Sequence, residues 1–129
     1  MAQLTRGTGN SKPKLCSPPG YEVIDKGTAT EVIAAGELCV IGASGWSKTA
    51  AGATDADGVA LKDYIAGQEG CDFLIQGEID GYGMSGGITP GIDIYPSASV
   101  AGGMQSDAVA ATTLRIKATT PTRLRFNFT

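Results

Sequence analysis

From Tyr21 onward, short apolar runs alternate with turn residues, and this rhythm limits the chain to a few architectures. Turn signals recur roughly every 8–12 residues, which is typical of a sandwich or a barrel. The longest alternation of side chains covers 73–80, where every second residue would point to the same face of a strand. Glycine accounts for 19 of the 129 residues, which suits many tight turns. We therefore predict an all-β fold, a small barrel or sandwich.

The apolar runs predict where the strands lie. We expect strands over 21–24, 30–33, 38–41, 46–49, 59–61, 73–80, 92–95, 114–117 and 124–128. The segment 38–49 has a glycine-rich centre and is expected to form a hairpin. A short helix is expected over 105–113, and 63–70 are expected to form a loop or a single helical turn. The similar segments 33–37 and 65–69 are both interpreted as turns that lead into a strand.

The length of the chain favours one domain, preceded by a segment of different composition. Residues 1–20 contain Arg6, Lys12 and Lys14, three prolines and no acidic residue. Such a segment cannot bury enough apolar surface to fold alone. It is either a flexible tail or an extended arm that becomes ordered on a partner. We therefore divide the chain into an N-terminal arm, 1–20, and a β domain, 21–129.

Charge is distributed unevenly along the chain, although the sum is only −3. Residues 1–26 hold four bases and two acids, and residues 27–111 hold eleven acids and two bases. Residues 112–129 hold four bases and no acid. Opposite patches of this kind suit association between subunits; the alternative is that the ends pair with the middle inside one subunit. The candidate contact residues are Arg6, Lys12, Lys14, Arg115, Lys117, Arg123 and Arg125.

Alternation near the C-terminus predicts a hairpin with one apolar and one basic face. Its apolar face is expected to carry Leu114, Ile116, Leu124, Phe126 and Phe128. Its other face then carries all four C-terminal bases, either solvated or facing an acidic neighbour.

Several motifs suggest chemistry but are incomplete. The chain has no histidine, so the segment 83–87, which matches a nucleophile elbow, has no general base. The segment 55–58 resembles the start of a calcium loop, but Tyr64 occupies the position of the essential glutamate. The segment 42–49 lacks the glycine that precedes the lysine of a phosphate loop. We interpret these segments as turns and expect no catalytic, cofactor or metal site.

Other classes of function also fit poorly. Three cysteines without a paired spacing favour neither a disulfide framework nor a zinc site. Glu78 and Asp80 share a strand face and are interpreted as a solvated acidic surface rather than a glycosidase pair. The acidic middle of the chain disfavours nucleic-acid binding. No apolar run reaches the length of a transmembrane helix, so we expect no membrane association.

Several of these pieces, taken in order, resemble the head decoration (capsid cement) proteins of tailed bacteriophages. The resemblance rests on the following segments: Ile33-Ala34-Ala35-Gly36-Glu37-Leu38, Gly58-Val59-Ala60-Leu61, Ala66-Gly67-Gln68, Gln76-Gly77-Glu78-Ile79, Gly87-Ile88-Thr89-Pro90-Gly91, Ile94-Tyr95-Pro96-Ser97, Gly102-Gly103-Met104 and Thr122-Arg123-Leu124-Arg125-Phe126. It implies a barrel-like or β-tulip domain that forms a trimer on the outer capsid surface. It also implies that this virion protein, assembled in the host cytoplasm, clamps neighbouring major capsid subunits and stabilises the expanded head.

The alternative is a carbohydrate- or receptor-binding β module of a phage tail or fibre. Such a module would need exposed aromatic side chains gathered in a groove. The aromatic residues other than phenylalanine are scattered along the chain: Tyr21, Trp46, Tyr64, Tyr82 and Tyr95.

Overall fold

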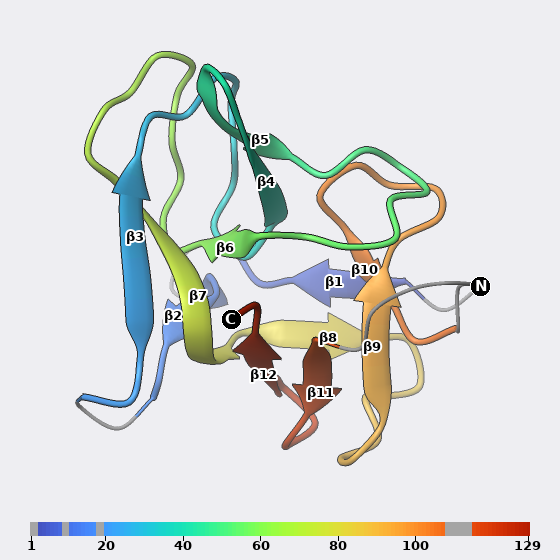
Figure 1. The fold of residues 1–129 in the computed structure, drawn as a ribbon. Helices are drawn as coiled ribbons and strands as arrows, with labels where there is room; N and C mark the ends of the chain where they lie inside the picture. The colour runs from blue at the N-terminus through green and yellow to red at the C-terminus, as the bar shows by residue number, and fades with distance from the viewer. Residues whose placement is uncertain (1–2, 9–10, 18–19, 108–114) are drawn as a thin grey trace.

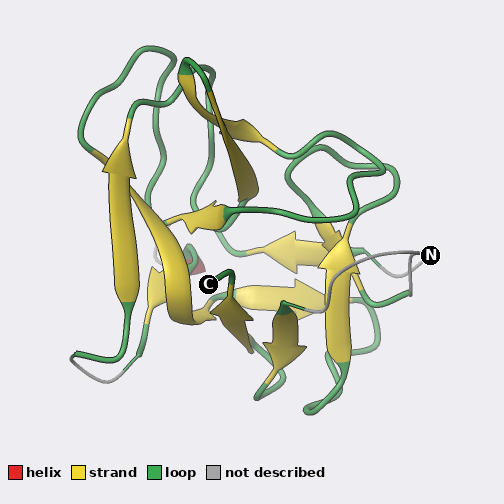
Figure 2. Ribbon diagram, in the orientation of Figure 1, coloured by secondary structure: helices red, strands yellow, loops and turns green. Residues whose placement is uncertain are grey.

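The computed structural model describes residues 3–8, 11–17, 20–107 and 115–129. Within these ranges the chain forms strands and no α-helix (Figures 1 and 2), so the predicted all-β class is confirmed. The strands are β1 (Leu4–Arg6), β2 (Lys14–Leu15), β3 (Val23–Gly27), β4 (Leu38–Gly42), β5 (Gly45–Lys48), β6 (Gly58–Ala60), β7 (Cys71–Asp80), β8 (Tyr82–Met84), β9 (Asp93–Pro96), β10 (Met104–Gln105), β11 (Ile116–Ala118) and β12 (Arg123–Asn127).

The longest strand, β7, organises the main sheet. The strand order is β10-β9-β11-β12-β7-β6-β4-β5, and β2 and β3 also pair with β7. Gln76 is opposite both Val23 of β3 and Asn127 of β12, so these two strands lie on opposite edges of β7. The sheet curls into a half-barrel, with β1 and β8 as a separate pair (Figure 1).

A bulge divides β7 into two parts. The register against β3 shifts between Val23 and Ile24. Nearby, Gly77 has a φ of 150°, and a Cβ there would lie 2.7 Å from Ser17 Oγ. The register shift shows that β7 contains an extra residue at this point. Such a bulge bends a strand and increases its twist. One end of β7 therefore packs into one apolar cluster and the other end into a second.

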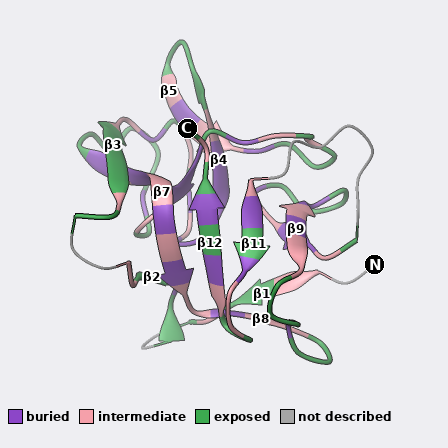
Figure 3. Cartoon of the chain, turned by 60° about the horizontal axis from the view of Figure 1, so that its bottom comes forward, coloured by how far each residue is buried: buried purple, intermediate pink, exposed green. Residues whose placement is uncertain are grey.

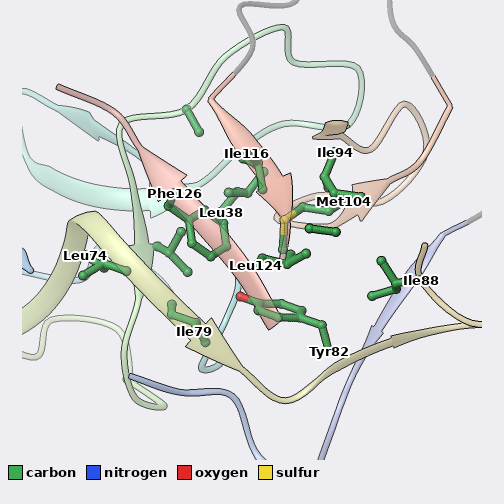
Figure 4. Packing of buried hydrophobic residues seen from close by; sticks show 13 residues of the cluster. Leu38, Leu74, Ile79, Tyr82, Ile88, Ile94, Met104, Ile116, Leu124 and Phe126 are labelled. Carbon is green, nitrogen blue, oxygen red and sulfur yellow. The ribbon is translucent and has the colours of Figure 1, made fainter. Parts of the chain in front are cut away.

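The larger cluster fills the half-barrel beneath β7, β9, β11 and β12. Figure 4 shows Phe126 and Leu124 of β12 beside Ile116, with Ile79 of the neighbouring strand β7 and the ring of Tyr82 close by. Its buried members are Leu38, Ala56, Val59, Leu74, Ile79, Tyr82, Ile88, Ile94, Met104, Ile116, Ala118, Leu124 and Phe126.

The smaller cluster is enclosed because the chain after β3 returns to β5. Trp46 N donates to Thr28 O at 2.7 Å, and Thr30 N donates to Trp46 O at 2.8 Å. These bonds link the two ends of the layer formed by β3, β7, β6, β4 and β5. Trp46 and Phe73 stack inside it with Tyr64.

The described part of residues 1–20 lies along the chain's own strands. β1 pairs with β8, β2 pairs with β7, and Gly7 N donates to Gly81 O at 2.9 Å. Pro13 is buried. These residues are thus part of the folded unit here, which differs from a flexible tail. The boundary at residue 20 and a role for the segment as an arm toward a partner stay predictions.

Most predicted strands are present, with some differences. The hairpin of β4 and β5 is confirmed. The strand expected over 30–33 is wrong, because in this stretch only Ile33 forms an isolated bridge, with Tyr64. Gln105, the first residue of the helix expected over 105–113, lies in strand β10 instead. Residues 108–114 lie outside the described residues.

The two similar segments do form matching turns, displaced by one residue from the sequence alignment. Glu37 N donates to Ala34 O and Gln68 N donates to Ile65 O, each at 3.1 Å. Gly36 and Gly67 occupy the third position with φ near 85° (86° and 83°), as a type II turn requires. In each turn the side-chain oxygen of the fourth residue also accepts from the backbone N–H of the first.

Candidate interaction surface

The C-terminal hairpin separates its apolar and basic side chains as predicted. Figure 3 shows buried and exposed residues alternating along β11 and β12. Ile116, Leu124 and Phe126 are buried, and Phe128 is half-buried. Leu114 lies outside the described residues. Lys117 and Arg125, which lie opposite each other, therefore share the outer face of the sheet.

Acidic residues on both sides compensate this pair of like charges. Lys117 is opposite Asp93 of β9, with Nζ 3.8 Å from Oδ1. Arg125 is opposite Glu78 of β7, with Nη2 3.7 Å from Oε2. Four adjacent strands thus carry a row in the order acid, base, base, acid. The side chain of Glu78 is only 16% exposed, so the interpretation of Glu78 as a solvated carboxylate is wrong.

Arg115 lies at the end of the same face. Its Nε and Nη2 each lie 3.4 Å from a carboxylate oxygen of Asp55, and Nη1 donates to Thr129 O at 3.3 Å. A shallow depression of about 430 Å³ lies between Arg115, Lys117 and Arg125. Its bases are already paired, so the depression offers little unbalanced charge.

Arg6 and Lys12 form a separate group with acids of the domain. Arg6 Nη2 lies 3.6 Å from Oε2 of Glu37, whose side chain is 9% exposed. Lys12 Nζ lies 2.6 Å from Asp63 Oδ2, and Ala35 N donates to the other oxygen of Asp63 at 2.9 Å. The hydrogen bond from Lys12, with that from Ala35, lowers the pKa of Asp63. Both bases thus attach the N-terminal segment to the chain's own turns.

Lys14 and Arg123 form a third group, centred on Asp80. Lys14 of β2 and Arg123 of β12 are both directly opposite Asp80, one on each edge of β7. The three residues therefore form a second cross-strand row. No ion pair within 4.0 Å joins them in the described chain. Asp80 Oδ1 instead accepts from Gly81 N at 2.9 Å, and Arg123 Nε is covered without an acceptor.

A depression of about 540 Å³ adjoins this second row. It is lined by Ser11, Lys12, Lys14, Leu15, Cys16, Asp80, Gly81 and Thr122. Burial raises the pKa of the Cys16 thiol, while the charge of Arg123 acts in the opposite direction. The charge of Arg123 therefore acts on the thiol of Cys16, which lines this depression.

The seven candidate residues thus form three groups, two on the outer face of the main sheet and one, Arg6 with Lys12, against the turns that hold Glu37 and Asp63. Analysis of the sequence alone did not identify their partners, the acids Glu37, Asp55, Asp63, Glu78 and Asp93. Every described ion pair, including Lys26 with Asp72, joins a base from the chain ends to an acid from 27–111. The alternative in which the charges pair inside one subunit therefore accounts for most of the segregation.

The elbow-like segment forms a turn, as predicted, whereas the turn expected over 55–58 is wrong: this stretch is irregular and leads into β6 at Gly58. Gly87 N donates to Met84 O at 2.8 Å in the elbow-like segment. In the segment 55–58, Asp55 contacts Arg115 and Asp57 accepts from Ile41 N at 2.8 Å. Among the described residues, no three histidine, cysteine, aspartate or glutamate side chains gather as a metal site. The described part of the chain also contains no helix long and apolar enough to cross a membrane.

Comparison of the chain with protein-family models, curated proteins and solved structures found no match.

Proposed function

We propose that this chain is a structural virion protein that decorates the head of a tailed bacteriophage. It binds the outer surface of the capsid and stabilises the expanded head by clamping neighbouring major capsid subunits. The ordered series of turn and strand segments that resembles decoration proteins motivates this proposal. A homotrimer on the particle is part of the same proposal.

One structural observation supports it beyond the resemblance. The outer face of β2, β7, β12, β11 and β9 carries charged side chains in two cross-strand rows beside open, shallow depressions. A broad charged face on a rigid sheet suits contact with another protein surface. Many copies on one particle would turn modest individual contacts into tight attachment.

The alternative, a glycan- or receptor-binding module, has weaker support. Stacking of a sugar needs an exposed aromatic ring. Trp46, Tyr64 and Tyr82 are each less than 5% exposed, since they belong to the two apolar clusters. Tyr21 is 40% exposed, and Tyr95 is half-buried on β9.

Co-sedimentation with phage heads tests the proposal. Purified protein is mixed with expanded, DNA-free heads that lack it, and bound protein is quantified after centrifugation. We expect saturable binding and heads that resist heating better than bare heads do. Unexpanded precursor heads serve as the comparison. Absence of saturable binding, together with glycan binding on an array, would favour the alternative module.

A further inference from the structure

The ion pairs identify which basic residues are available to a partner. Six of the ten lysines and arginines contact an acid within 4.0 Å in the described chain. The four without such a contact are Lys14, Lys48, Lys62 and Arg123. Two of these four, Lys14 and Arg123, lie in the same cross-strand row.

The row places both charges on one face. Residues directly opposite each other on paired strands point to the same side, so Lys14, Asp80 and Arg123 all lie on the outer face. Paired strands lie about 5 Å apart, which places the two bases about 10 Å apart across β7. Flexible side chains of this length reach a common group above Asp80. The row carries two positive charges and one negative charge.

Asp80 is already committed to the turn that follows β7. Its Oδ1 accepts from Gly81 N at 2.9 Å, which holds the carboxylate toward the end of the strand. Arg123, in contrast, has a covered Nε without an acceptor. Because Nε is covered, a partner would meet the terminal nitrogens of the guanidinium, whose fork matches the two oxygens of a carboxylate.

The row adjoins the open depression that Lys14, Cys16, Asp80 and Thr122 line, which leaves room for a segment of a partner chain beside the two bases.

We propose that Lys14 and Arg123 form a docking site for an acidic peptide segment of a partner protein. Its carboxylate lies between the two bases. This inference rests on the proposed function in one respect, since it assigns the partner segment to the capsid subunit.

A peptide titration tests the site without the capsid. The amide spectrum of ¹⁵N-labelled protein is followed as the blocked peptide Leu-Asp-Glu-Leu is added, with Leu-Asn-Gln-Leu as the uncharged control. We expect weak binding that shifts the amides of 14–16, 80–81 and 122–123, and at least about tenfold weaker binding of the control peptide. Shifts elsewhere, or equal shifts with both peptides, would overturn the site. Stronger competition by inorganic phosphate than by acetate would point instead to a phosphate-bearing partner and would also overturn it.

A second arm uses the phage heads. Lys14→Gln combined with Arg123→Gln is compared with Lys48→Gln combined with Lys62→Gln, which removes the two other unpaired bases. Circular dichroism confirms that both proteins fold. We expect the first variant to bind heads about tenfold more weakly at low salt, and the second to bind within about twofold of wild type.

The two arms separate the possible failures. If wild-type protein binds heads and the first variant binds equally well, the docking site is wrong and the proposed function stands. If the peptide binds at the site but wild-type protein does not bind heads, the proposed function is wrong and the site stands.

Discussion

The indole of Trp46 lies flat on the ring of Phe73, with the ring centroids 4.3 Å apart and the planes 8° from parallel. Trp46 comes from β5 and Phe73 from β7, strands that are separated in the sheet by β4 and β6. The stack therefore spans the interior of the smaller apolar cluster and joins its two sides. Since Trp46 is the one tryptophan of the chain, its fluorescence reports on this cluster alone.

Truncating the stack should destabilise the protein unequally at its two rings. Phe73→Ala should lower the free energy of unfolding by about 3–5 kcal/mol, because it leaves a cavity in a fully buried site. Trp46→Phe should cost less, about 1–2 kcal/mol, because it also removes a buried indole N–H that has no acceptor. Urea unfolding followed by circular dichroism measures both. Equal costs would indicate that the indole N–H makes a hydrogen bond in solution.

Trp46 also explains why β3 ends in glycine. A Cβ on Gly27 would lie 2.5 Å from Trp46 Cδ1 and 2.6 Å from Nε1. Gly27→Ala should therefore lower stability by about 1–3 kcal/mol through overpacking. Gly42, which ends β4, is a matched control, because the nearest atom to its added Cβ is Gly45 O at 3.8 Å. Gly42→Ala should change stability by less than about 0.5 kcal/mol. A tolerated Gly27→Ala would show that the indole moves easily.

Local alternation predicted the C-terminal hairpin well. Its inward and outward sides depend only on neighbours in the sequence, and Phe126 and Leu124 are both fully buried. By contrast, β1, β2, β8 and β10 have only two or three residues each and leave no periodic pattern to detect. Their existence depends on partners far away in the chain, such as β8 for β1.

The electrostatics of the candidate surface could be predicted only in part. The sequence indicated four outward bases on the C-terminal hairpin and no nearby acid. Whether those bases are paired depends on the register of β9 and β7, which brings Asp93 and Glu78 beside Lys117 and Arg125. That register is set by the packing of distant strands and not by local pattern. The same holds for Lys14 and Arg123, which lie in one row only because β2 and β12 place both residues opposite Asp80.

The inward register of Phe126 can be tested against its outward neighbour. Phe126→Ala should cost about 3–5 kcal/mol, because the fully buried ring contacts Tyr82 and Phe128. Arg125→Ala should cost less than about 1 kcal/mol, since its ion pair with Glu78 is partly exposed. Thermal unfolding of both variants provides the measurement. A similar loss in the two variants would contradict the assigned faces.

The ion pair between Lys12 and Asp63 should make stability depend on pH in the acid range. The pKa of Asp63 is lowered in the folded state, so its contribution is complete above the ordinary aspartate pKa of about 3.9. It is lost as the pH falls through the depressed pKa. Asp63→Asn should therefore be less stable than wild type at pH 7, and the difference should shrink at lower pH. Lys12→Met should reproduce the effect. A constant difference from pH 7 to pH 2.5 would mean that the charge does not contribute.

The attachment of β1 to the domain leads to the last prediction. Arg6 is the base beside the buried carboxylate of Glu37, whose other oxygen accepts from Ala34 N at 2.7 Å. Removing residues 1–8 would uncover the edge of β8 and leave Glu37 without its counter-charge. We expect the truncated protein to fold with a lower urea midpoint, because burying an uncompensated charge is unfavourable. Glu37→Gln should recover part of the loss in the truncated protein but destabilise the full-length protein, in which Arg6 would then lack its partner. If Glu37→Gln has the same effect in both backgrounds, Arg6 and Glu37 are not coupled, and β1 is held by its backbone pairing with β8 alone.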